Sequence, residues 1–391
     1  MAHIDETPAP YGGGMSPAEP SRLVVIGAGM VAHRVVESLR ARDGDRRWRV
    51  TVLGDEGRRP YDRIALSTVV DGGDPAALEL GAPLLWSDPR IELRADDAAV
   101  AIDREARVVL TQSGARIPYD RVVLATGSSA RLPAVPGSQL DGVFVIRTAD
   151  DALALRAWVD ERRARLGVVR GAVLGGGLLG LEAAGSLQSM GVETTVVQSS
   201  GRLMSAQLDE GGSAALRRLI EQRGIRVLTE RRTRAVSGTP SGDVGGLVFT
   251  DGERLDADVV VVAVGITPRD ELAVAVRARL AGTGIAFVDN WSDAALTDLR
   301  YWSIDRLHLN AFGHARVAGN VLAALGVEVP AAAHAPYAVG ERLDIARPRT
   351  AEYWRQYVLP WIGRRLTGRS SGDGRTAKRP TLLPVEVLGE G

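Results

Sequence analysis

The stretch RLVVIGAG (residues 22–29), followed by MVAHRVVESLRAR (30–42), decides the fold. Branched apolar side chains run into glycines, which predicts a short buried strand that ends in a tight turn. After the turn, apolar side chains recur at helical spacing, Val31, Val35 and Leu39 among them. A strand, a glycine turn and a helix in this order predict the first unit of an α/β domain with a parallel sheet.

The glycines of this turn have the spacing of a dinucleotide-binding loop. Gly27, Gly29 and Ala32 form the pattern G-x-G-x-x-A. Gly27 allows the tight turn, Gly29 lets the backbone approach a pyrophosphate, and Ala32 permits close packing of helix on strand. The N–H groups at the start of the helix then face the phosphates, which predicts a nucleotide site here.

A second predicted strand supplies the acid that such a site needs. RVTVLGDE (residues 49–56) is apolar and ends in Asp55 and Glu56. A carboxylate at the end of the second strand hydrogen-bonds the ribose hydroxyls of a bound dinucleotide. We take Asp55 for this residue and keep Glu56 as the alternative.

Two later segments fit the same site. RPYDRIALS (59–67) follows the acid, and YDRVVLATGSSARLPAVPG (119–137) contains a predicted strand that ends in Ala125-Thr126-Gly127. A glycine turn after a buried strand lets the backbone pass close to a nucleotide. In this order, the segments favour FAD as the ligand of the first domain.

A second glycine pattern begins far along the chain. GAVLGGGLLGLEAAGSLQSM (171–190) predicts another strand, then Gly175, Gly177 and Gly180, then a helix. A later strand in DADVVVVAVGITPRDEL (256–272) is followed by Gly265, which predicts a glycine turn at the end of this domain. The sequence therefore predicts two Rossmann-like dinucleotide-binding domains of the α/β class.

The strand after the second glycine pattern lacks the usual acid. ETTVVQ (193–198) ends at Gln198, and Arg202 follows. NAD-preferring domains place an acid at this position to hold both ribose hydroxyls. The choice between NADH and NADPH is therefore open.

Glu182 follows the last glycine of the second pattern, and we place it on the first turn of the predicted helix. Two interpretations stay open. Its carboxylate lies near the junction of nicotinamide and flavin, or it complements the positive end of the helix dipole.

Four phrases resemble a known family: GAGMVAHR, VTVLGDEGRRPYDRIALS, GGGLLGLEAAGSL and RLMSAQLDEGGSAALRRLIE. They are similar to the flavin domain of the assimilatory nitrite reductase large subunit, in the pyridine nucleotide-disulfide oxidoreductase superfamily. The resemblance covers about residues 21–272. It implies hydride transfer from NAD(P)H to FAD, and then to a small-molecule or protein electron acceptor. It places FAD on Gly27, Gly29, Asp55, Arg63, Thr126 and Gly127, and NAD(P)H on Gly175, Gly177, Gly180 and Glu182.

Composition excludes several classes of chemistry. The chain has no cysteine, which excludes disulfides, Fe–S clusters and a catalytic dithiol, so it is not a complete nitrite reductase. The five histidines show no metal-binding spacing, and we expect no metal site. A formal net charge of zero gives no sign of a nucleic-acid or membrane partner. Without a signal peptide or a long apolar run, the expected location is cytoplasmic.

The C-terminal third follows a different pattern. Asp305 and His308, followed by Gly313-His314 and an apolar helical stretch, resemble the last block of SGNH (GDSL-type) hydrolases. In that family the two residues belong to a catalytic triad with a serine. The serine block and the oxyanion-hole blocks of that family are missing from this chain. The pair is therefore either a remnant of an esterase or a polar cap on a helix that begins at Asn310.

The predicted organisation joins these parts near residues 270–278. The flavin family returns to its first domain with a strand ending in Gly-Asp or Gly-Glu, and no such segment follows residue 272. The junction is a genuine fusion or an assembly artefact. Beside an oxidoreductase and an esterase, a non-catalytic fusion product is therefore the third functional alternative. The parts are a disordered lead (1–20), an incomplete FAD-binding domain (21–147), a NAD(P)-binding domain (148–272), an SGNH-like partial α/β fragment (273–330) and a largely disordered extension (331–391).

Overall fold

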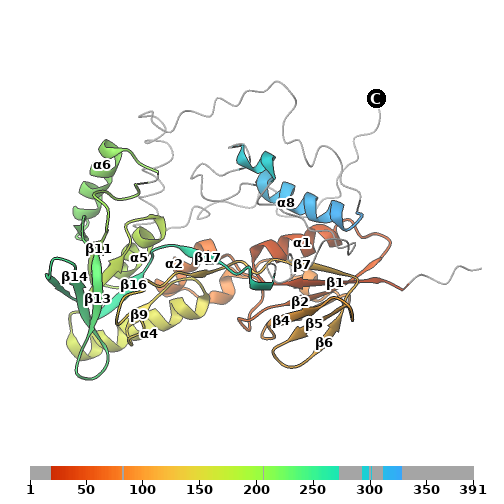
Figure 1. Ribbon diagram of the computed structural model, residues 1–391, viewed down its shortest axis with the longest axis horizontal. Coiled ribbons are helices and arrows are strands. Elements are labelled where there is room, and N and C mark those ends of the chain that lie inside the picture. Colours follow the sequence, from red (N-terminus) through yellow and green to blue (C-terminus); the bar gives the residue numbers. More distant parts are fainter. Residues whose placement is uncertain are drawn as a thin grey trace, which may run out of the picture.

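Two α/β domains make up most of the computed structural model (Figure 1). Each combines a parallel sheet with a small antiparallel sheet. This confirms the predicted α/β class and its Rossmann-like sheets. The structure describes residues 19–81, 83–205, 207–272, 293–298, 301 and 311–327.

The first domain is built on a four-stranded parallel sheet. In spatial order its strands are β3 (Ile91–Arg94), β2 (Trp48–Leu53), β1 (Ser21–Ile26) and β7 (Arg121–Leu124). Helix α1 (Met30–Arg40) joins β1 to β2. Leu23 and Val25 of β1 pack with α1, whereas Val24 and Ile26 belong to the core on the opposite face. This alternation is the two-residue period of a strand that is buried on both faces.

An antiparallel meander covers that opposite face. Val109 and Ile117 of the meander share a core with Val24, Ile26 and Leu53 of the parallel sheet. Its strands are β4 (Ala99–Asp103), β5 (Val108–Thr111) and β6 (Arg116–Pro118).

The connection between β2 and β3 reaches the second domain. It contains two 3₁₀ turns (Arg63–Ala65 and Pro75–Leu78) and the short helices α2 (Leu66–Val70) and α3 (Pro83–Trp86). Leu66, Val69 and Val70 of α2 are buried in the core of the second domain. The two domains are therefore joined by packed apolar side chains as well as by the chain.

The second domain repeats the plan of the first. Its parallel sheet has the order β12 (Arg226–Leu228), β11 (Glu193–Val197), β10 (Arg170–Leu174), β16 (Val259–Val262) and β9 (Val143–Phe144). One face packs against helices, and the other against an antiparallel meander. The helices are α4 (Ala149–Leu166), α5 (Leu178–Ser189) and α6 (Glu210–Glu221), and the meander strands are β13 (Thr233–Gly238), β14 (Val244–Phe249) and β15 (Arg254–Asp256).

A two-stranded antiparallel ribbon lies where the chain passes between the domains. It pairs β8 (Ser128–Ala130), which follows the first sheet, with β17 (Ile266–Pro268), which follows the second. The two segments that carry Gly127 and Gly265 are thereby held next to each other.

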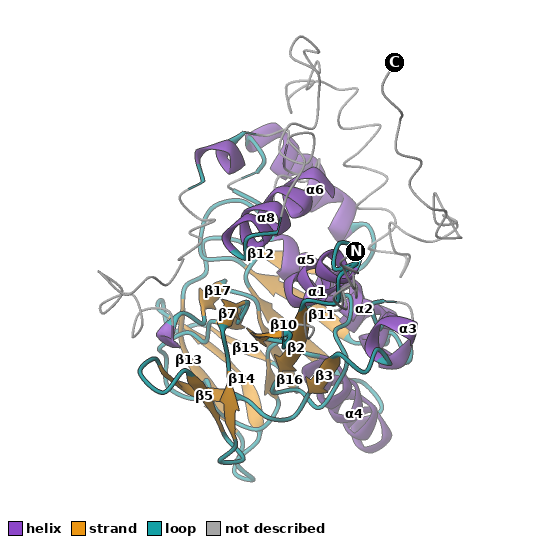
Figure 2. Cartoon of the chain, turned by 90° about the vertical axis from the view of Figure 1, so that its right-hand side faces the viewer, coloured by secondary structure: helices purple, strands orange, loops and turns teal. Residues whose placement is uncertain are grey.

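The last described helix, α8 (Ala311–Ala324), lies against α1 (Figures 1 and 2). Val321 and Leu322 are buried in the core that contains Val35 and Val36 of α1. A 3₁₀ turn (Ala294–Thr297) precedes it, and the carboxylate of Asp293 accepts hydrogen bonds from Arg316 and Asn320 of α8. This part of the predicted 273–330 fragment thus extends the first domain's core.

Among the described residues, β7 pairs with β1 alone. Residues 273–292, the first part of the predicted 273–330 fragment, lie outside the described part of the chain. Within the described ranges, no helix is long and apolar enough to cross a membrane.

We expect Leu322→Ala to lower the free energy of unfolding by about 2–5 kcal/mol, because Leu322 is 2% exposed and its truncation leaves a cavity in a shared core. Chemical denaturation measures the change, with Ala323→Ser on the exposed side of α8 as the matched control. Equal stability of the two variants would contradict the docking of α8.

Candidate functional site

The two glycine turns have the same geometry. Gly27 and Gly175 both have positive φ, at +109° and +112°. A Cβ on Gly27 would lie 2.2 Å from the carbonyl oxygen of Ala125, and one on Gly175 would lie 2.4 Å from that of Ala263. Only glycine fits either position, because both the backbone conformation and the neighbouring strand exclude a side chain.

The second glycines of the two patterns are open instead. Nothing lies within 4 Å of a Cβ built on Gly177, and the nearest atom to one on Gly29 is Arg63 Nε, 3.9 Å away. Each is the N-cap of its helix, α1 or α5, without a side-chain hydrogen bond. The helix N-termini therefore face open space at the places where phosphates were predicted.

The last residue of each glycine pattern, Ala32 or Gly180, allows close packing of the helix. Ala32 is fully buried, and a Cβ on Gly180 would lie 1.9 Å from the carbonyl oxygen of Gly175. These residues bring α1 and α5 close to their glycine loops, as predicted for the pattern.

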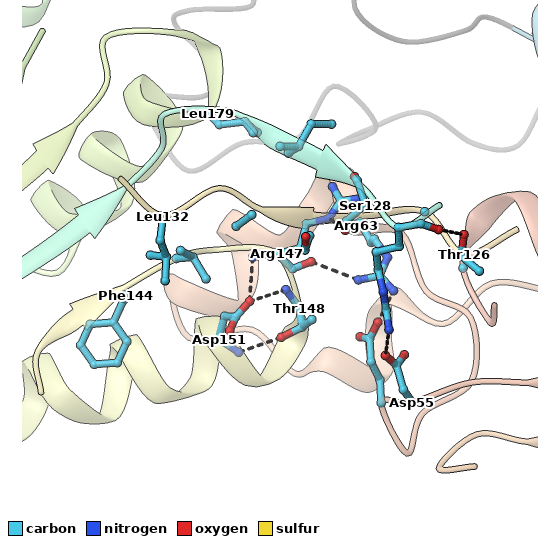
Figure 3. Close-up of a pocket in the computed structure, with 18 of the residues that line it drawn as sticks. Asp55, Arg63, Thr126, Ser128, Leu132, Phe144, Arg147, Thr148, Asp151 and Leu179 are labelled. Carbon is cyan, nitrogen blue, oxygen red and sulfur yellow. Dashed lines mark hydrogen bonds and ion pairs between the residues drawn. The ribbon is translucent and has the colours of Figure 1, made fainter. Parts of the chain in front are cut away.

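Both turns open into one cavity of about 1990 Å³ between the domains. Figure 3 shows its central part. The first domain contributes its glycine turn and the turn after β7, and the second contributes its glycine turn, α4 and the turn after β16. Ten predicted site residues line it: Gly27, Gly29, Asp55, Glu56, Arg63, Thr126, Gly127, Gly177, Glu182 and Gly265. Ala32, Gly175, Gly180 and Gln198 do not.

The two candidate acids have different partners. Asp55 forms an exposed ion pair with Arg269, 2.7 Å between Oδ2 and Nη2 (Figure 3). Glu56 accepts a hydrogen bond from the hydroxyl of Tyr61 and pairs with the guanidinium of Arg63. Glu56 is thus engaged in a cluster with half-buried Arg63 and buried Tyr61, and Asp55 is the more accessible carboxylate. This favours Asp55, our first choice, for the ribose.

Tyr61 is the centre of that cluster. Its hydroxyl accepts hydrogen bonds from the backbone N–H of Ala149, 3.0 Å, and from Arg63, 3.1 Å. Burial, together with the hydrogen bond to Glu56, raises the pKa of the Tyr61 phenol well above its usual range. The phenol therefore stays neutral and ties the first domain to the start of α4.

Arg147 forms part of the cavity wall that the sequence did not reveal. Its guanidinium donates to the backbone oxygen and the hydroxyl of Ser128, 2.8 and 2.7 Å (Figure 3). Burial, and then the nearby Arg63, lower the pKa of Arg147. The one local signal was the capping box of Thr148 and Asp151, which fixes the start of α4 beside it.

Glu182 requires a correction. It is the fifth residue of α5, which begins at Leu178, and the first turn of this helix contains no acid. The helix-dipole interpretation therefore loses its basis, because the dipole effect falls off within the first turn. Glu182 instead lines the cavity together with Arg63 and Arg147.

Gln198 and Gly265 follow β11 and β16, the two strands of the second domain that flank β10. Gln198 directly follows β11, and its side-chain oxygen accepts the N–H of Gly176, 2.8 Å. Gly265 has a φ of +119°, and its carbonyl accepts the N–H of Arg131 from the first domain. The predicted glycine turn at the end of this domain is thus also a contact between domains.

Asp305 and His308 lie outside the described residues, as does Asn310. Within the described ranges, no group of three or more His, Cys, Asp or Glu could hold a metal ion.

Comparison with known proteins identifies the family. The family model described as pyridine nucleotide-disulphide oxidoreductase matches residues 21–299. The chain belongs to this family. FAD and NAD(P)H are the cofactors of the family.

Sequence relatives agree with this membership. The chain is 41% identical over 252 residues to the nitrite reductase [NAD(P)H] large subunit of Klebsiella oxytoca, covering 64% of this chain and 25% of that protein. It is 39% identical over 260 residues to the ferredoxin–NAD(+) reductase component of the anthranilate 1,2-dioxygenase system of Burkholderia cepacia, covering 65% of this chain and 60% of that protein. The chain thus spans between a quarter and three fifths of the length of these two curated relatives.

Solved structures share the fold. The ferredoxin reductase for the CYP199A2 system from Rhodopseudomonas palustris matches with a TM-score of 0.60 and 33% identity, covering 66% of this chain and 62% of that one. A covalent complex of putidaredoxin reductase with putidaredoxin gives the same TM-score at 26% identity, covering 66% and 61%.

The two kinds of glycine predict different phenotypes. Gly27→Ala should destabilise the first domain by about 1–3 kcal/mol for the backbone conformation alone, with a further cost from the clash with Ala125. Gly29→Ala, at an extended φ of −97°, should leave stability unchanged and weaken FAD binding. Thermal unfolding and FAD fluorescence titration of the pair separate the two effects. If Gly29→Ala bound FAD as tightly as the parent chain, its open face would not be a phosphate site.

Proposed function

We propose that this chain is a FAD-dependent NAD(P)H oxidoreductase that passes electrons from a reduced nicotinamide to an external acceptor. The single cavity that both glycine turns enter supports this proposal most directly. A flavin held by the first turn and a nicotinamide held by the second would meet inside it.

The described residues fit both groups. The faces of Gly29 and Gly177 are open, so each turn leaves room for a pyrophosphate against backbone N–H groups. Thr126 and Gly127 continue the wall of the first site, and Gly265 continues the wall between the two. We infer that Ala32, Gly175 and Gly180, which do not line the cavity, act through packing.

The chain's own contribution is to bind and orient. Bound FAD would supply the hydride chemistry, as cofactors do in such enzymes. Asp55 would accept hydrogen bonds from the ribose hydroxyls, which requires its exposed ion pair with Arg269 to rearrange or to share the carboxylate. The apolar side chains of Leu132 and Leu179 line the same cavity and would exclude water from the meeting point of the two rings.

Glu182 would act as a positioning residue in this arrangement. It lies on α5 beside the second glycine turn and shares the cavity wall with two cationic side chains, Arg63 and Arg147. A carboxylate at this place balances their charge and fixes how they face the bound rings. This role fits the interpretation in which Glu182 stands at the junction of nicotinamide and flavin.

The acceptor must be supplied from outside. The chain contains no cysteine, so no dithiol within it can take the electrons on. The relatives from the dioxygenase and CYP199A2 systems are named as ferredoxin reductases. By analogy, we propose a protein electron carrier as the acceptor.

The visible absorption spectrum tests the proposal. We expect full-length protein, purified and then incubated with FAD, to show flavin bands that bleach when NADH or NADPH is added without oxygen. Free FAD under the same conditions is the control. A protein that remains colourless after reconstitution would contradict the proposal, and so would bound flavin that neither nucleotide reduces.

The esterase alternative makes a separate prediction. Acyl-ester hydrolysis needs a nucleophile and an oxyanion hole, and the corresponding sequence blocks are missing. We therefore expect hydrolysis of a short p-nitrophenyl ester to be equal in the parent chain and in His308→Ala, both near the background rate. A rate that disappears in His308→Ala would instead establish the esterase activity.

A further inference from the structure

The adenosine end of the second nucleotide site differs from the usual arrangement at one side chain. β11 ends at Val197, and Gln198 follows it beside the glycine loop. A Cβ on Gly176 would lie 3.2 Å from the Cβ of Gln198, so the side chain lies directly against the loop. In a Rossmann-like domain, this position contacts the ribose of the adenosine.

The amide of Gln198 is held in one orientation. Its Oε1 accepts the N–H of Gly176, 2.8 Å, and its Nε2 donates to Oγ of Ser200, 2.6 Å. Ser200 Oγ in turn donates to the backbone oxygen of Arg202, 3.1 Å. A carboxylate could accept hydrogen bonds from both ribose hydroxyls, whereas the oxygen of this amide is already engaged and its nitrogen is a donor.

The charges around Gln198 also differ from those of a site that binds the two free ribose hydroxyls of NADH. Arg202 is exposed, and its Nη2 donates to the backbone oxygen of Ser205, 3.3 Å. No ion pair joins Arg202 to an acid within the described ranges. Arg231, whose backbone N–H donates to the carbonyl oxygen of Gln198, is neutralised by Asp251 and Glu253. Among the described residues, the guanidinium of Arg202, four residues past Gln198, is therefore left without a carboxylate partner.

We propose that this site binds the 2′-phosphate of NADPH and that the chain prefers NADPH to NADH. The inference rests on the proposed function, because it takes the second domain to bind a nicotinamide dinucleotide. An uncharged amide at residue 198 removes the repulsion that an acid would exert on a phosphate. The guanidinium of Arg202 then supplies the charge-assisted hydrogen bonds that phosphates receive from arginine.

Glu230 is a nearby acid whose negative charge would weaken the preference for NADPH, because it repels a 2′-phosphate. Its carboxylate lies 3.7 Å from the place of a Cβ on Gly201, in the loop that contains Arg202. Its backbone N–H donates to the oxygen of Ser200, which ties the two loops together. Glu230 is exposed, so water and salt screen its charge more than they would screen that of an acid at residue 198.

Calorimetric binding of two adenosine nucleotides tests the proposal without flavin reduction. Adenosine 2′,5′-bisphosphate represents the NADPH end and adenosine 5′-monophosphate the NADH end. The full-length chain is titrated with excess FAD present, so that the first site is not available to either probe. We expect the bisphosphate to bind at least tenfold more tightly, a difference of about 1.4 kcal/mol.

Three substitutions locate the effect. Gln198→Glu should weaken binding of the bisphosphate about tenfold and leave or improve binding of the monophosphate. Arg202→Ala should weaken the bisphosphate alone, about fivefold, and Glu230→Gln should strengthen it. Arg254→Ala removes an exposed arginine on β15 of the same domain and should change neither affinity.

The outcomes separate this inference from the proposed function. Tighter binding of the monophosphate, or a preference that Gln198→Glu and Arg202→Ala leave unchanged, would overturn the inference alone. Failure of both probes to bind would overturn it together with the nicotinamide part of the proposed function. Binding of the bisphosphate by a protein that takes up no FAD would uphold the inference only if Gln198→Glu and Arg202→Ala weaken that binding, and it would then contradict only the flavin part.

Discussion

The structure depends on two places where a backbone carbonyl occupies the space of a missing side chain. Gly27 packs against the oxygen of Ala125, and Gly175 packs against that of Ala263. In each domain this contact brings the glycine turn, the helix N-terminus and the turn of the neighbouring strand to one point. The same steric requirement, met twice in one chain, leaves two helix N-termini, at Gly29 and Gly177, open toward a common cavity. The adjacent Gly29 and Gly177 can then be open, because the turns are already fixed by their neighbours.

A partly buried polar cluster sets how the two helix N-termini face each other. Tyr61 belongs to the first domain by sequence, yet its hydroxyl accepts the N–H of Ala149 at the start of α4. Glu56 accepts the hydrogen bond of the phenol, and Arg63 donates to the phenol and pairs with Glu56. This network stabilises the joint, because the buried hydroxyl of Tyr61 would lose hydrogen bonds if either half-buried partner were removed. Glu56, the acid next to Asp55, therefore has a structural role, because it holds Tyr61 and Arg63 at the contact between the two domains.

Local patterns predicted the elements and the turns, whereas long-range partners stayed hidden. The tight turn at Gly27 and the packing of Ala32 follow from spacing alone, and the geometry agrees with both. The pyrophosphate contact of Gly29 stays a prediction. The sequence could not choose between Asp55 and Glu56, because the choice depends on which acid Tyr61 contacts locally and on Arg269, which reaches Asp55 from a distant part of the chain. Arg147 was missed for the same reason, since its partner Ser128 lies on another element. Glu182 was placed one turn too early because the helix begins at Leu178, before the last glycine of the pattern.

The C-terminal segment shows how resemblance and packing can differ. Residues 311–324 were assigned to a fragment of another fold, yet α8 buries Val321 and Leu322 against the first domain. An amphipathic helix needs only an apolar surface of the right shape, and the outer face of α1 offers one. Arg316 and Asn320 then bind Asp293, where hydrogen bonds from both side chains hold the pKa of the carboxyl at about 2. The helix therefore serves the first domain's core whatever its ancestry, and that core depends on a segment that follows both parallel sheets in the chain.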